Sequence, residues 1–367
     1  MHPELPYLIA LTAIPQIGNK QARVLLAHFE QPSEIFRAKQ RELEQLDGIG
    51  PIRATSLREA MDLNRAEAEC RFIERNHIQP ILFTDKTYPR RLAECADAPI
   101  LLYYQGVADL NPTRALGVIG TRHHTPYGQQ LTQQLIQAIT LAQPQIISGL
   151  ALGIDTLAHR SALEAGLPTI GVLGHGLDRI YPYANRQLAE QMKEQGGLLT
   201  EFMSGVKPDR THFPRRNRIV AGLCDAMIVV ETSDQGGSMI TAGFAAGYHR
   251  DVFAFPGRVT DERSHGNHQL IRHNLAALIE SGHDVVESMN WIDKKTNATA
   301  VQPSLFPDIA PTEQVLYDLI PTTGSILIDD LYRLAGLTNS ALASTLLQLE
   351  MNGLVCQLPG KRYQRMR

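Results

Sequence analysis

Tryptophan and cysteine are scarce in this chain of 367 residues, which holds one tryptophan and four cysteines. The cysteines lie far apart, without a C-x-x-C pair and without histidines at zinc spacing. This pattern argues against a structural metal and favours a reducing compartment. The sequence therefore predicts no metal site and a cytoplasmic protein.

Long apolar runs are missing too. No stretch approaches the roughly 20 apolar residues that a membrane helix needs. The beginning of the chain, MHPELPYLIALTAIPQIG, has no basic region of the kind found in signal peptides. We therefore expect no membrane partner.

An excess of charge of either sign is also absent, because the formal net charge is −3. No overall positive field draws the chain to a polyanion, so any site for one must be local. An apolar content of 43% and a charged content of 20% are typical of a folded globular protein. The length allows two or three domains.

The motifs of several enzyme classes are lacking. There is no G-x-x-x-x-G-K-[ST] loop for ATP, no G-x-S-x-G elbow and no H-E-x-x-H helix. The segment GVIGTRHH lacks the spacing of a dinucleotide fingerprint. No catalytic residue and no cofactor are therefore predicted, and histidines such as His159 and His175 are interpreted as solvated or core residues.

Residues 1–70 are predicted to form a small helical domain, because this stretch contains a short internal repeat. IPQIGNKQARVLLAHF and LDGIGPIRATSLREAM each place a glycine turn ahead of a helical apolar period. These features are typical of SAM-like helix-hairpin-helix units, in which Gly18, Gly48 and Gly50 permit tight turns. Two interpretations stay open: the backbone N–H groups after the turns contact DNA phosphates, or the unit is a scaffold that docks a partner.

Residues 75–290 alternate β-rich runs with helical stretches, which predicts an α/β domain with a mostly parallel, Rossmann-like sheet and helices on both faces. The runs ALGVIG, PQIISGL, PTIGVLG, GLLTEF, DAMIVVET and DVFAFPG are continuously apolar, as strands of a doubly covered sheet are. In such sheets ligands bind at the carboxyl ends of the strands. Four loops at these ends are rich in glycine.

Glycine loops let backbone N–H groups approach an anion closely, and helix N-termini add partial positive charge. The combination predicts a phosphate site, although close packing explains any one loop equally well. The loops are GVIGTR, SGLALGID, GHGLDRIYP and SDQGGSMITAG. Their candidate DNA-binding residues are Gly120, Thr121, Arg122, Ser148, Gly149, Gly236, Gly237 and Ser238.

The segment from Lys207 to Arg218 carries five basic residues against the single acid Asp209. Phe213 lies inside it, and an aromatic ring beside guanidinium groups suits an unpaired base whose phosphates are neutralised. The segment therefore predicts a site for single-stranded nucleic acid. Its candidate residues are Arg210, Phe213, Arg215, Arg216, Asn217 and Arg218. The alternative is that Asn217 and Arg218 face inward and bond loop carbonyls.

Taken in order, GVIGTR, SGLALGID, GHGLDRIYP, FPRRNRIVAGL, GGSMITAG and FAFPG resemble the DprA family, also called Smf, of bacterial DNA-processing proteins. The resemblance implies a Rossmann-like domain that binds single-stranded DNA without sequence preference. It also implies a homodimer that loads the recombinase RecA during natural transformation, and no enzymatic activity. Gly120, Thr121 and Arg122 match the family's phosphate-clamping motif. Arg210, Phe213 and residues 216–218 match its base-contacting loop.

The polar stretch 291–311 is predicted to be a linker, and residues 312–367 resemble a winged helix. Three helical segments precede an apolar strand, a Pro-Gly turn and a second strand, and the recognition-type helix is expected to start at Asn339 or Ser340. That helix carries almost no basic residue, which favours a protein partner over duplex DNA. The basic end of the chain, from Lys361 to Arg367, either touches DNA or serves only solubility.

A competing interpretation is an enzyme, because the same topology resembles the lysine-decarboxylase-like phosphoribohydrolases, which split nucleotide N-glycosidic bonds. The resemblance implies a catalytic glutamate just after a glycine-rich loop, whereas QGGSMITAG is followed by residues 244–247, FAAG. General acid–base chemistry needs a carboxylate there. A transcriptional regulator, a third alternative, depends on the winged helix alone.

Overall fold

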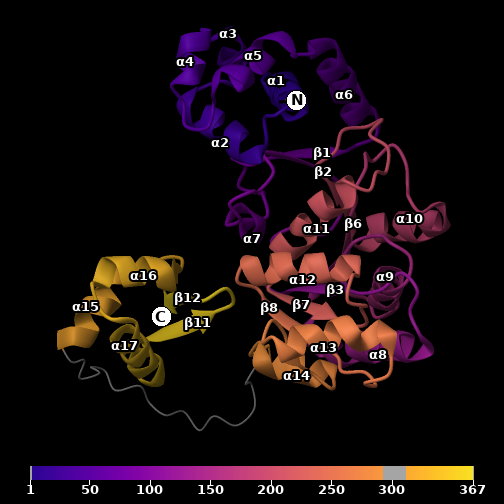
Figure 1. Ribbon diagram of the computed structural model, residues 1–367, viewed down its shortest axis with the longest axis vertical. Coiled ribbons are helices and arrows are strands. Elements are labelled where there is room, and N and C mark those ends of the chain that lie inside the picture. Colours follow the sequence, from indigo (N-terminus) through magenta and orange to yellow (C-terminus); the bar gives the residue numbers. More distant parts are fainter. Residues whose placement is uncertain (1, 292–310, 367) are drawn as a thin grey trace.

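The computed structural model describes residues 2–291 and 311–366, and Figure 1 shows three parts that follow one another along the chain. The first part is a bundle of short helices: α1 (Leu5–Ala13), α2 (Asn19–His28), α3 (Pro32–Arg37), α4 (Gln40–Glu44), α5 (Pro51–Glu59) and α6 (Leu63–Arg75). Gly18 and Gly50 stand directly before α2 and α5, so each of the two similar segments is a turn followed by a helix. The predicted helix-hairpin-helix organisation is confirmed.

The central part is built around a nine-stranded sheet with the order β1-β2-β6-β5-β4-β3-β7-β8-β9. Strands β3 to β9 are parallel, whereas β1 pairs with β2 and β2 with β6 in antiparallel fashion. The strands are β1 (Gln79–Leu82), β2 (Leu101–Gly106), β3 (Ala115–Ile119), β4 (Gln145–Ser148), β5 (Thr169–Val172), β6 (Gly197–Thr200), β7 (Ala226–Val229), β8 (Asp251–Ala254) and β9 (Ala277–Leu278). The predicted mostly parallel sheet is confirmed, and β1, β2 and β9 extend it at its two edges.

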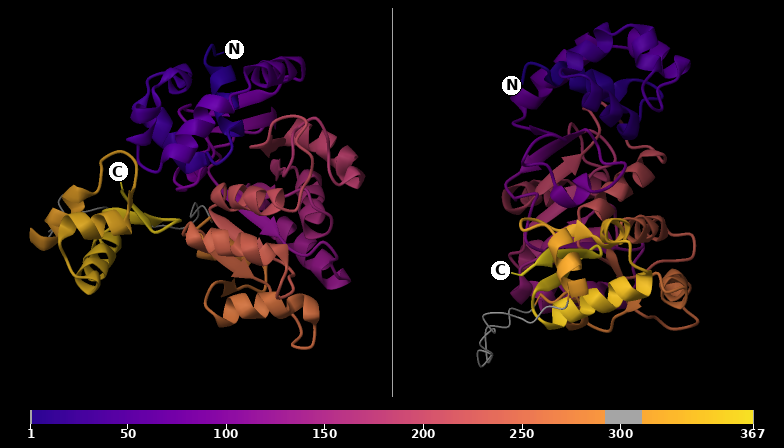
Figure 2. Two further views of the ribbon diagram at one scale, coloured as in Figure 1. Left: turned by 45° about the horizontal axis from the view of Figure 1, so that its top comes forward. Right: turned by 90° about the vertical axis from the view of Figure 1, so that its left-hand side faces the viewer.

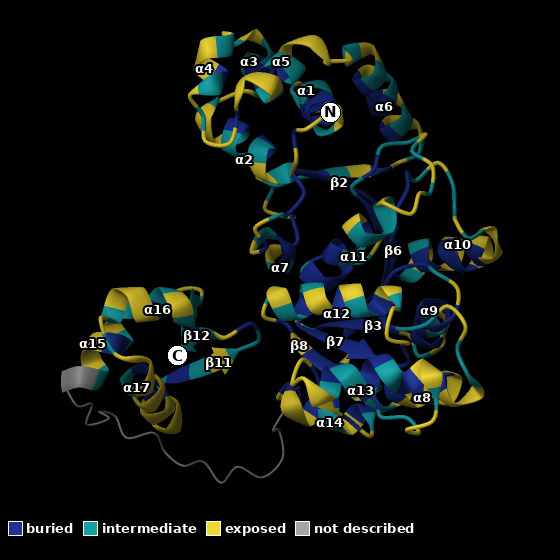
Figure 3. Ribbon diagram, in the orientation of Figure 1, coloured by how far each residue is buried: buried dark blue, intermediate teal, exposed yellow. Residues whose placement is uncertain are grey.

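Helices cover both faces of this sheet. On β3, Leu116 and Val118 pack into a buried cluster with α8 (Pro126–Ile139), α9 (Ile154–Glu164) and α14 (Gly282–Ser288). Ala115 and Ile119 belong to a second cluster with α7 (Arg90–Ala93), α11 (His212–Gly222) and α12 (Gly237–Gly247). The central strands therefore have no exposed face (Figure 3), which explains their continuously apolar sequences. The remaining helices of this part are α10 (Arg186–Gln195) and α13 (His265–Arg272).

The order of the strands reverses at β3. From β3 the chain adds β4, β5 and β6 on one side, and then returns to add β7, β8 and β9 on the other. The loops that follow β3 and β7 therefore diverge at a topological switch point, the place where open parallel sheets bind ligands. The glycine loops at Gly120 and Gly236 follow these two strands.

The third part contains α15 (Pro311–Leu319), β10 (Ile326–Leu327), α16 (Ile328–Ala335), α17 (Asn339–Met351), β11 (Val355–Leu358) and β12 (Arg362–Arg365). The strands form a small sheet with the order β10-β12-β11, and the winged-helix prediction is confirmed. Helix α17 starts at Asn339, and the Thr338 hydroxyl caps it by accepting a hydrogen bond from the Ala341 amide. In Figures 1 and 2 the β11–β12 hairpin points toward the central part. The predicted linker 291–311 lies, apart from its end residues, outside the described ranges.

Among the described helices, none combines the length and the apolar character needed to span a membrane.

Candidate nucleic-acid interface

The loop after β3 approaches its neighbours so closely that Gly120 has no room for a side chain. A Cβ there would lie 2.5 Å from Ile154 Cγ1 and 3.0 Å from the Glu231 carbonyl oxygen. The Thr121 amide donates to that carbonyl at 2.7 Å, and the Thr121 carbonyl accepts from the Ile154 amide at 3.1 Å. The backbone of the predicted Gly-Thr-Arg motif is therefore clamped between β7 and the start of α9, and Arg122 is exposed at the rim.

Glu231 holds the far end of the same loop. Its side chain is buried, and it accepts a hydrogen bond from the Thr125 amide at 2.9 Å and another from the Thr125 hydroxyl. Thr125 in turn caps α8 by accepting from the Gly128 amide at 3.1 Å. Carbonyl and carboxylate of one residue thus fix both ends of the loop that carries Arg122.

Two aromatic rings lie beside this arginine. The guanidinium carbon of Arg122 is 5.2 Å from the centroid of the Phe213 ring. The Tyr181 ring lies 6.3 Å from Phe213, centroid to centroid, with an angle of 28° between the planes. The three side chains border a small cavity of about 60 Å³, whose lining includes Leu150 and Leu173. This mixture of cation, aromatic faces and aliphatic floor suits a nucleobase.

The basic segment is helical where the sequence suggested a loop, because residues 212–222 form α11. The arginine side chains of this helix point in different directions, some toward solvent and some into the fold. Arg215 is exposed, with 55% of its side chain accessible, although its guanidinium lies 3.7 Å from Glu201 and 4.9 Å from the Phe202 ring. Arg210, just before the helix, is exposed as well. Asn217 is half-buried, and its Oδ1 accepts a hydrogen bond from Arg216.

Arg216 faces inward, whereas the sequence predicted a contact with DNA, and it lines the cavity beside Arg122 and Phe213. Its guanidinium is buried, donates to the Val172 carbonyl and lies beside Asp155, over Gly149. Burial lowers the pKa of Arg216 and raises that of Asp155, whereas the attraction between the two charges opposes both shifts. Arg216 therefore braces the floor of the site.

Arg218 also faces inward, as the alternative interpretation allowed. Only 8% of its side chain is exposed, and its Nη2 lies 2.5 Å from Glu201 Oε2. Its Nη1 donates to the Asp97 carbonyl at 2.6 Å. A buried cation that is already paired is not available to a phosphate, so the phosphate contact expected of Arg218 is replaced by a structural ion pair.

Three further residues that the sequence predicted to bind DNA are buried beneath the rim. Ser148 is fully buried and its hydroxyl donates to the Val118 carbonyl at 2.6 Å, while Gly149 is buried beneath Arg216. Ser238 is buried too, and its hydroxyl donates to Thr232 Oγ1 at 2.6 Å. The sequence predicted contacts of these three with DNA, whereas in the structure they pack within the fold. Gly236 and Gly237 remain at the accessible start of α12, where a Cβ on Gly237 would meet nothing within 4 Å.

His159 and His175 are core residues. The His159 ring is buried between Thr169 Oγ1 and the Gly149 carbonyl, and burial lowers its pKa to about 4. His175 is buried as well, and burial lowers its pKa. Both are neutral near pH 7, and their hydrogen bonds are used within the fold.

Sequence reasoning missed Tyr181 and the carboxylates that hold the arginines. Tyr181 stands in the loop GHGLDRIYP, but nothing in its spacing from Phe213 predicts that the rings meet. Glu201 directly follows β6, and Asp155 lies in the first turn of α9. A carboxylate next to the end of a strand is a signal that some of the arginines have internal partners. Glu231, at the end of the run DAMIVVE, was a similar signal.

A doubly covered parallel sheet whose switch point is lined by glycine loops, exposed arginines and an aromatic pair defines a Rossmann-like protein with a basic, glycine-lined rim. Residues 79–290 match the family described as DNA recombination-mediator protein A. Residues 299–361 match the DprA winged helix domain, and residues 8–61 match a SAM-like helix-hairpin-helix tandem. The chain belongs to the DNA recombination-mediator protein A (DprA/Smf) family, as the motifs predicted.

Several relatives resemble this chain closely. Protein Smf of Synechocystis is 34% identical over 399 residues, which cover 99% of each chain. The X-ray structure of DNA processing protein A from Streptococcus pneumoniae is 34% identical, with a TM-score of 0.66 over 77% of this chain and 95% of the other. A structure of DNA processing protein A from Helicobacter pylori, described by its single-stranded DNA binding mode, is 28% identical, with a TM-score of 0.53 over 58% of this chain and 95% of that one.

Proposed function

We propose that this chain binds single-stranded DNA without sequence preference along the rim formed by Arg122, Arg210, Phe213, Arg215 and Tyr181. The observation that carries the proposal is the arrangement of Arg122 against the Phe213–Tyr181 pair at the switch point. A stacked base needs both of its faces free, and duplex DNA hides them. The Helicobacter pylori structure, which is described as showing a single-stranded DNA binding mode, agrees with this choice.

The phosphates of the strand would be held by two kinds of group. Exposed guanidinium groups supply charge, and the amides of Gly120 and Gly237 supply donors at two glycine loops. None of these contacts reads a base edge, so binding is insensitive to sequence. The buried Arg216 and Arg218 keep α11 in place and contribute no phosphate contact of their own.

The protein would act as a binder and not as an enzyme. Helix α12, which follows the glycine loop 236–237, consists of GSMITAGFAAG and carries no acid. The buried carboxylate nearest in sequence, Glu231, is engaged by Thr125. A phosphoribohydrolase needs a free general acid or base at the ligand, so hydrolysis is the less favoured function.

A homodimer is part of the same proposal, and the two edges of the sheet differ in a way that favours one of them. At β1 the outward-facing positions are Pro80, which has no N–H, and Leu82, whose amide donates to Asp85 at 2.8 Å. At the other edge, β9 is paired on one side with β8, and Leu275 and Leu278 are about half exposed. A second copy would therefore pair near β9, within the stretch HQLIRHNLAALIE.

Protection of incoming strands and RecA loading during natural transformation follow from the family and complete the proposal, as does a cytoplasmic location. The binding function is tested by fluorescence anisotropy with unrelated oligonucleotides of one length and with the matching duplexes. We expect equal affinities for the single strands and weaker binding of the duplexes. Release of free base from nucleoside monophosphates would instead identify the hydrolase.

A further inference from the structure

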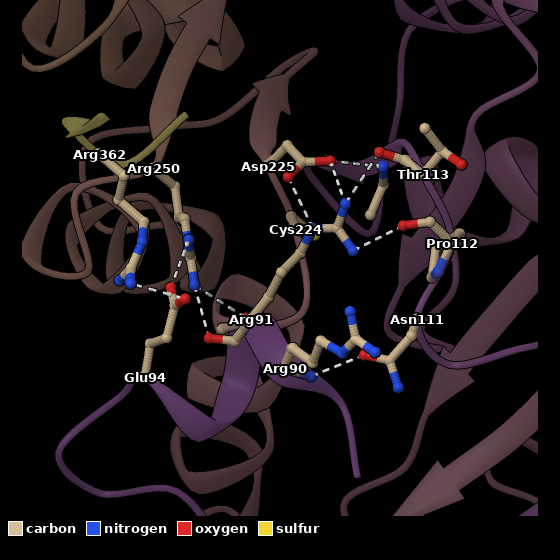
Figure 4. A network of polar contacts seen from close by, with 12 residues as sticks. Arg90, Arg91, Glu94, Asn111, Pro112, Thr113, Cys224, Asp225, Arg250 and Arg362 are labelled. Carbon is tan, nitrogen blue, oxygen red and sulfur yellow. Dashed lines mark hydrogen bonds and ion pairs between the residues drawn. The ribbon is translucent and has the colours of Figure 1, made fainter. Parts of the chain in front are cut away.

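The wing of the winged-helix domain comprises residues 359–361 between β11 and β12, and Arg362, directly after it, contacts Glu94 in the central part (Figure 4). We call the segment from Arg90 to Asp97, which contains Glu94, the junction. Glu94 of the junction stands between two arginines. Its Oε1 is 3.2 Å from Nη1 of Arg362 on β12, and its Oε2 is 3.7 Å from Nη1 of Arg250.

The backbone of the wing also comes close. A Cβ built on Gly360 would be 3.5 Å from Arg250 Nη1 and 3.5 Å from the His249 carbonyl oxygen. The turn has φ +82° at Gly360, a left-handed conformation that favours glycine. A Cβ at these distances would make ordinary contacts, so it is the turn that favours glycine at this position.

The junction is a firm support for this contact. Arg91 forms two hydrogen bonds to Asp225, at 2.6 and 2.9 Å, and a third to the Pro112 carbonyl at 2.9 Å. Arg250 is buried and donates to the Arg91 carbonyl at 2.6 Å. Glu94 is thus presented from a segment that the sheet domain fixes on several sides.

The same segment anchors two other parts of the molecule. Arg23 on α2 of the N-terminal domain donates to the Cys95 carbonyl at 3.2 Å. Arg218 on α11 donates to the Asp97 carbonyl at 2.6 Å. The wing therefore docks where the N-terminal domain and the helix of the DNA-binding rim are already attached.

The docking contact occupies Arg362, a cation of the kind that contacts phosphates in a DNA-binding winged helix. Arg362 donates to Ser325 Oγ at 2.8 Å and to the Ser325 carbonyl at 3.1 Å, and its remaining nitrogen faces Glu94. Arg365 lies over the Tyr317 ring at 4.2 Å and 3.7 Å from Asp318. Since α17 has no lysine or arginine, the cations near the wing are Arg362, Arg365 and the exposed Lys361 of the wing itself. The Glu94 carboxylate occupies the place of a phosphate on Arg362.

We propose that Glu94 docks the wing onto the sheet domain and so withholds Arg362 from the phosphates of duplex DNA. Both side chains are partly exposed, 38% for Glu94 and 20% for Arg362, so salt weakens the contact and a polyanion competes for it. The docking contact lies apart from the single-strand rim and does not depend on what that rim binds.

The first test measures the dimensions of the full-length protein by small-angle X-ray scattering at low and high salt. Glu94→Gln and Arg362→Gln each remove the ion pair at nearly constant size, and both should increase the radius of gyration at low salt. The wild type should reach the same value only at high salt. Arg333→Gln is the matched control, because Arg333 is 74% exposed and pairs with Asp330 inside the winged helix. Unchanged dimensions in both variants would overturn the docking.

The second test measures the affinity of the same variants for a blunt duplex at low salt. Glu94→Gln frees Arg362 for one more phosphate, which should tighten binding about five- to tenfold. Arg362→Gln opens the domain but removes the cation, so its affinity should stay at the wild-type value. No gain in Glu94→Gln, or an equal gain in both variants, would overturn the role of Arg362.

Discussion

Arg122, in the loop after β3, and Phe213, on α11, are almost a hundred residues apart in sequence. The guanidinium carbon of Arg122 nevertheless lies 5.2 Å from the centroid of the Phe213 ring, at the switch point of the sheet. Glu231 fixes the loop of the arginine, and the inward-facing Arg216 and Arg218 fix the helix of the phenyl ring. A cation over an aromatic face is held there before any ligand arrives. A preorganised site of this kind loses little side-chain entropy on binding.

Removal of either aromatic ring should weaken the binding of single-stranded DNA. For Phe213→Ala and for Tyr181→Ala we expect a loss of about 1–3 kcal/mol, the usual contribution of one stacked base. Fluorescence anisotropy with a short oligonucleotide measures the loss. Tyr183→Ala is the control, since that ring is 74% exposed and lies outside the aromatic pair. Equal affinity of the Phe213 variant and the wild type would remove stacking from the account.

Exposed arginines should be distinguished from buried ones by the salt dependence of binding. Arg122→Ala and Arg215→Ala should each flatten the slope of log K against log salt by about 0.7, the value for one phosphate of a single strand. Arg160→Ala, which removes an exposed charge on α9, should leave the slope unchanged. An unaltered slope in the Arg122 variant would assign that residue to structure.

The Arg218–Glu201 pair should matter for stability. Removal of one partner leaves the other buried and uncompensated, so Arg218→Ala should lower the free energy of unfolding by about 3–5 kcal/mol. Arg215→Ala, on the exposed side of the same helix, should change it by about 0.5 kcal/mol or less. Urea denaturation measures both values. If Arg218→Ala unfolds like the wild type but binds DNA with a flatter salt slope, the original expectation of a phosphate contact is right after all.

His159 should make the fold sensitive to acid. Its pKa is about 4 in the folded protein and about 6.5 in an unfolded chain, so the unfolded state binds more protons between these values. Stability from this residue is complete above pH 6.5 and falls as the pH drops toward 4, by about 3 kcal/mol in total. Urea denaturation at several pH values should therefore show a smaller loss over this window for His159→Gln than for the wild type. Equal losses would mean that His159 does not titrate differently in the two states.

The sequence could predict the doubly covered sheet because apolar runs such as ALGVIG and DAMIVV have no polar face to place in solvent. It also located the glycine loops, since the carboxyl ends of parallel strands meet at one edge. The direction of the arginines on α11 could not be read in the same way. That direction depends on where Glu201 and Asp155 lie after folding, and on the helical character of residues 212–222, which Pro214 and the basic residues obscured.

Tyr181 and Glu94 show a second limit of sequence reasoning. Each acts through a partner brought near by the fold: Phe213 for the tyrosine, and Arg250 and Arg362 for the glutamate. A motif describes neighbours along the chain, whereas these pairs join separate elements. Such contacts become visible only when the strand order and the domain positions are known.

The most direct measurement is photochemical cross-linking of an oligothymidine that carries 4-thiothymidine, followed by mass spectrometry of the joined peptides. A base stacked between rings at the switch point should cross-link to peptides that contain Phe213 and Tyr181, and excess unlabelled single strand should abolish the signal. Cross-links confined to the N-terminal helices or the winged helix would contradict the account, because the strand would then bind away from the glycine rim.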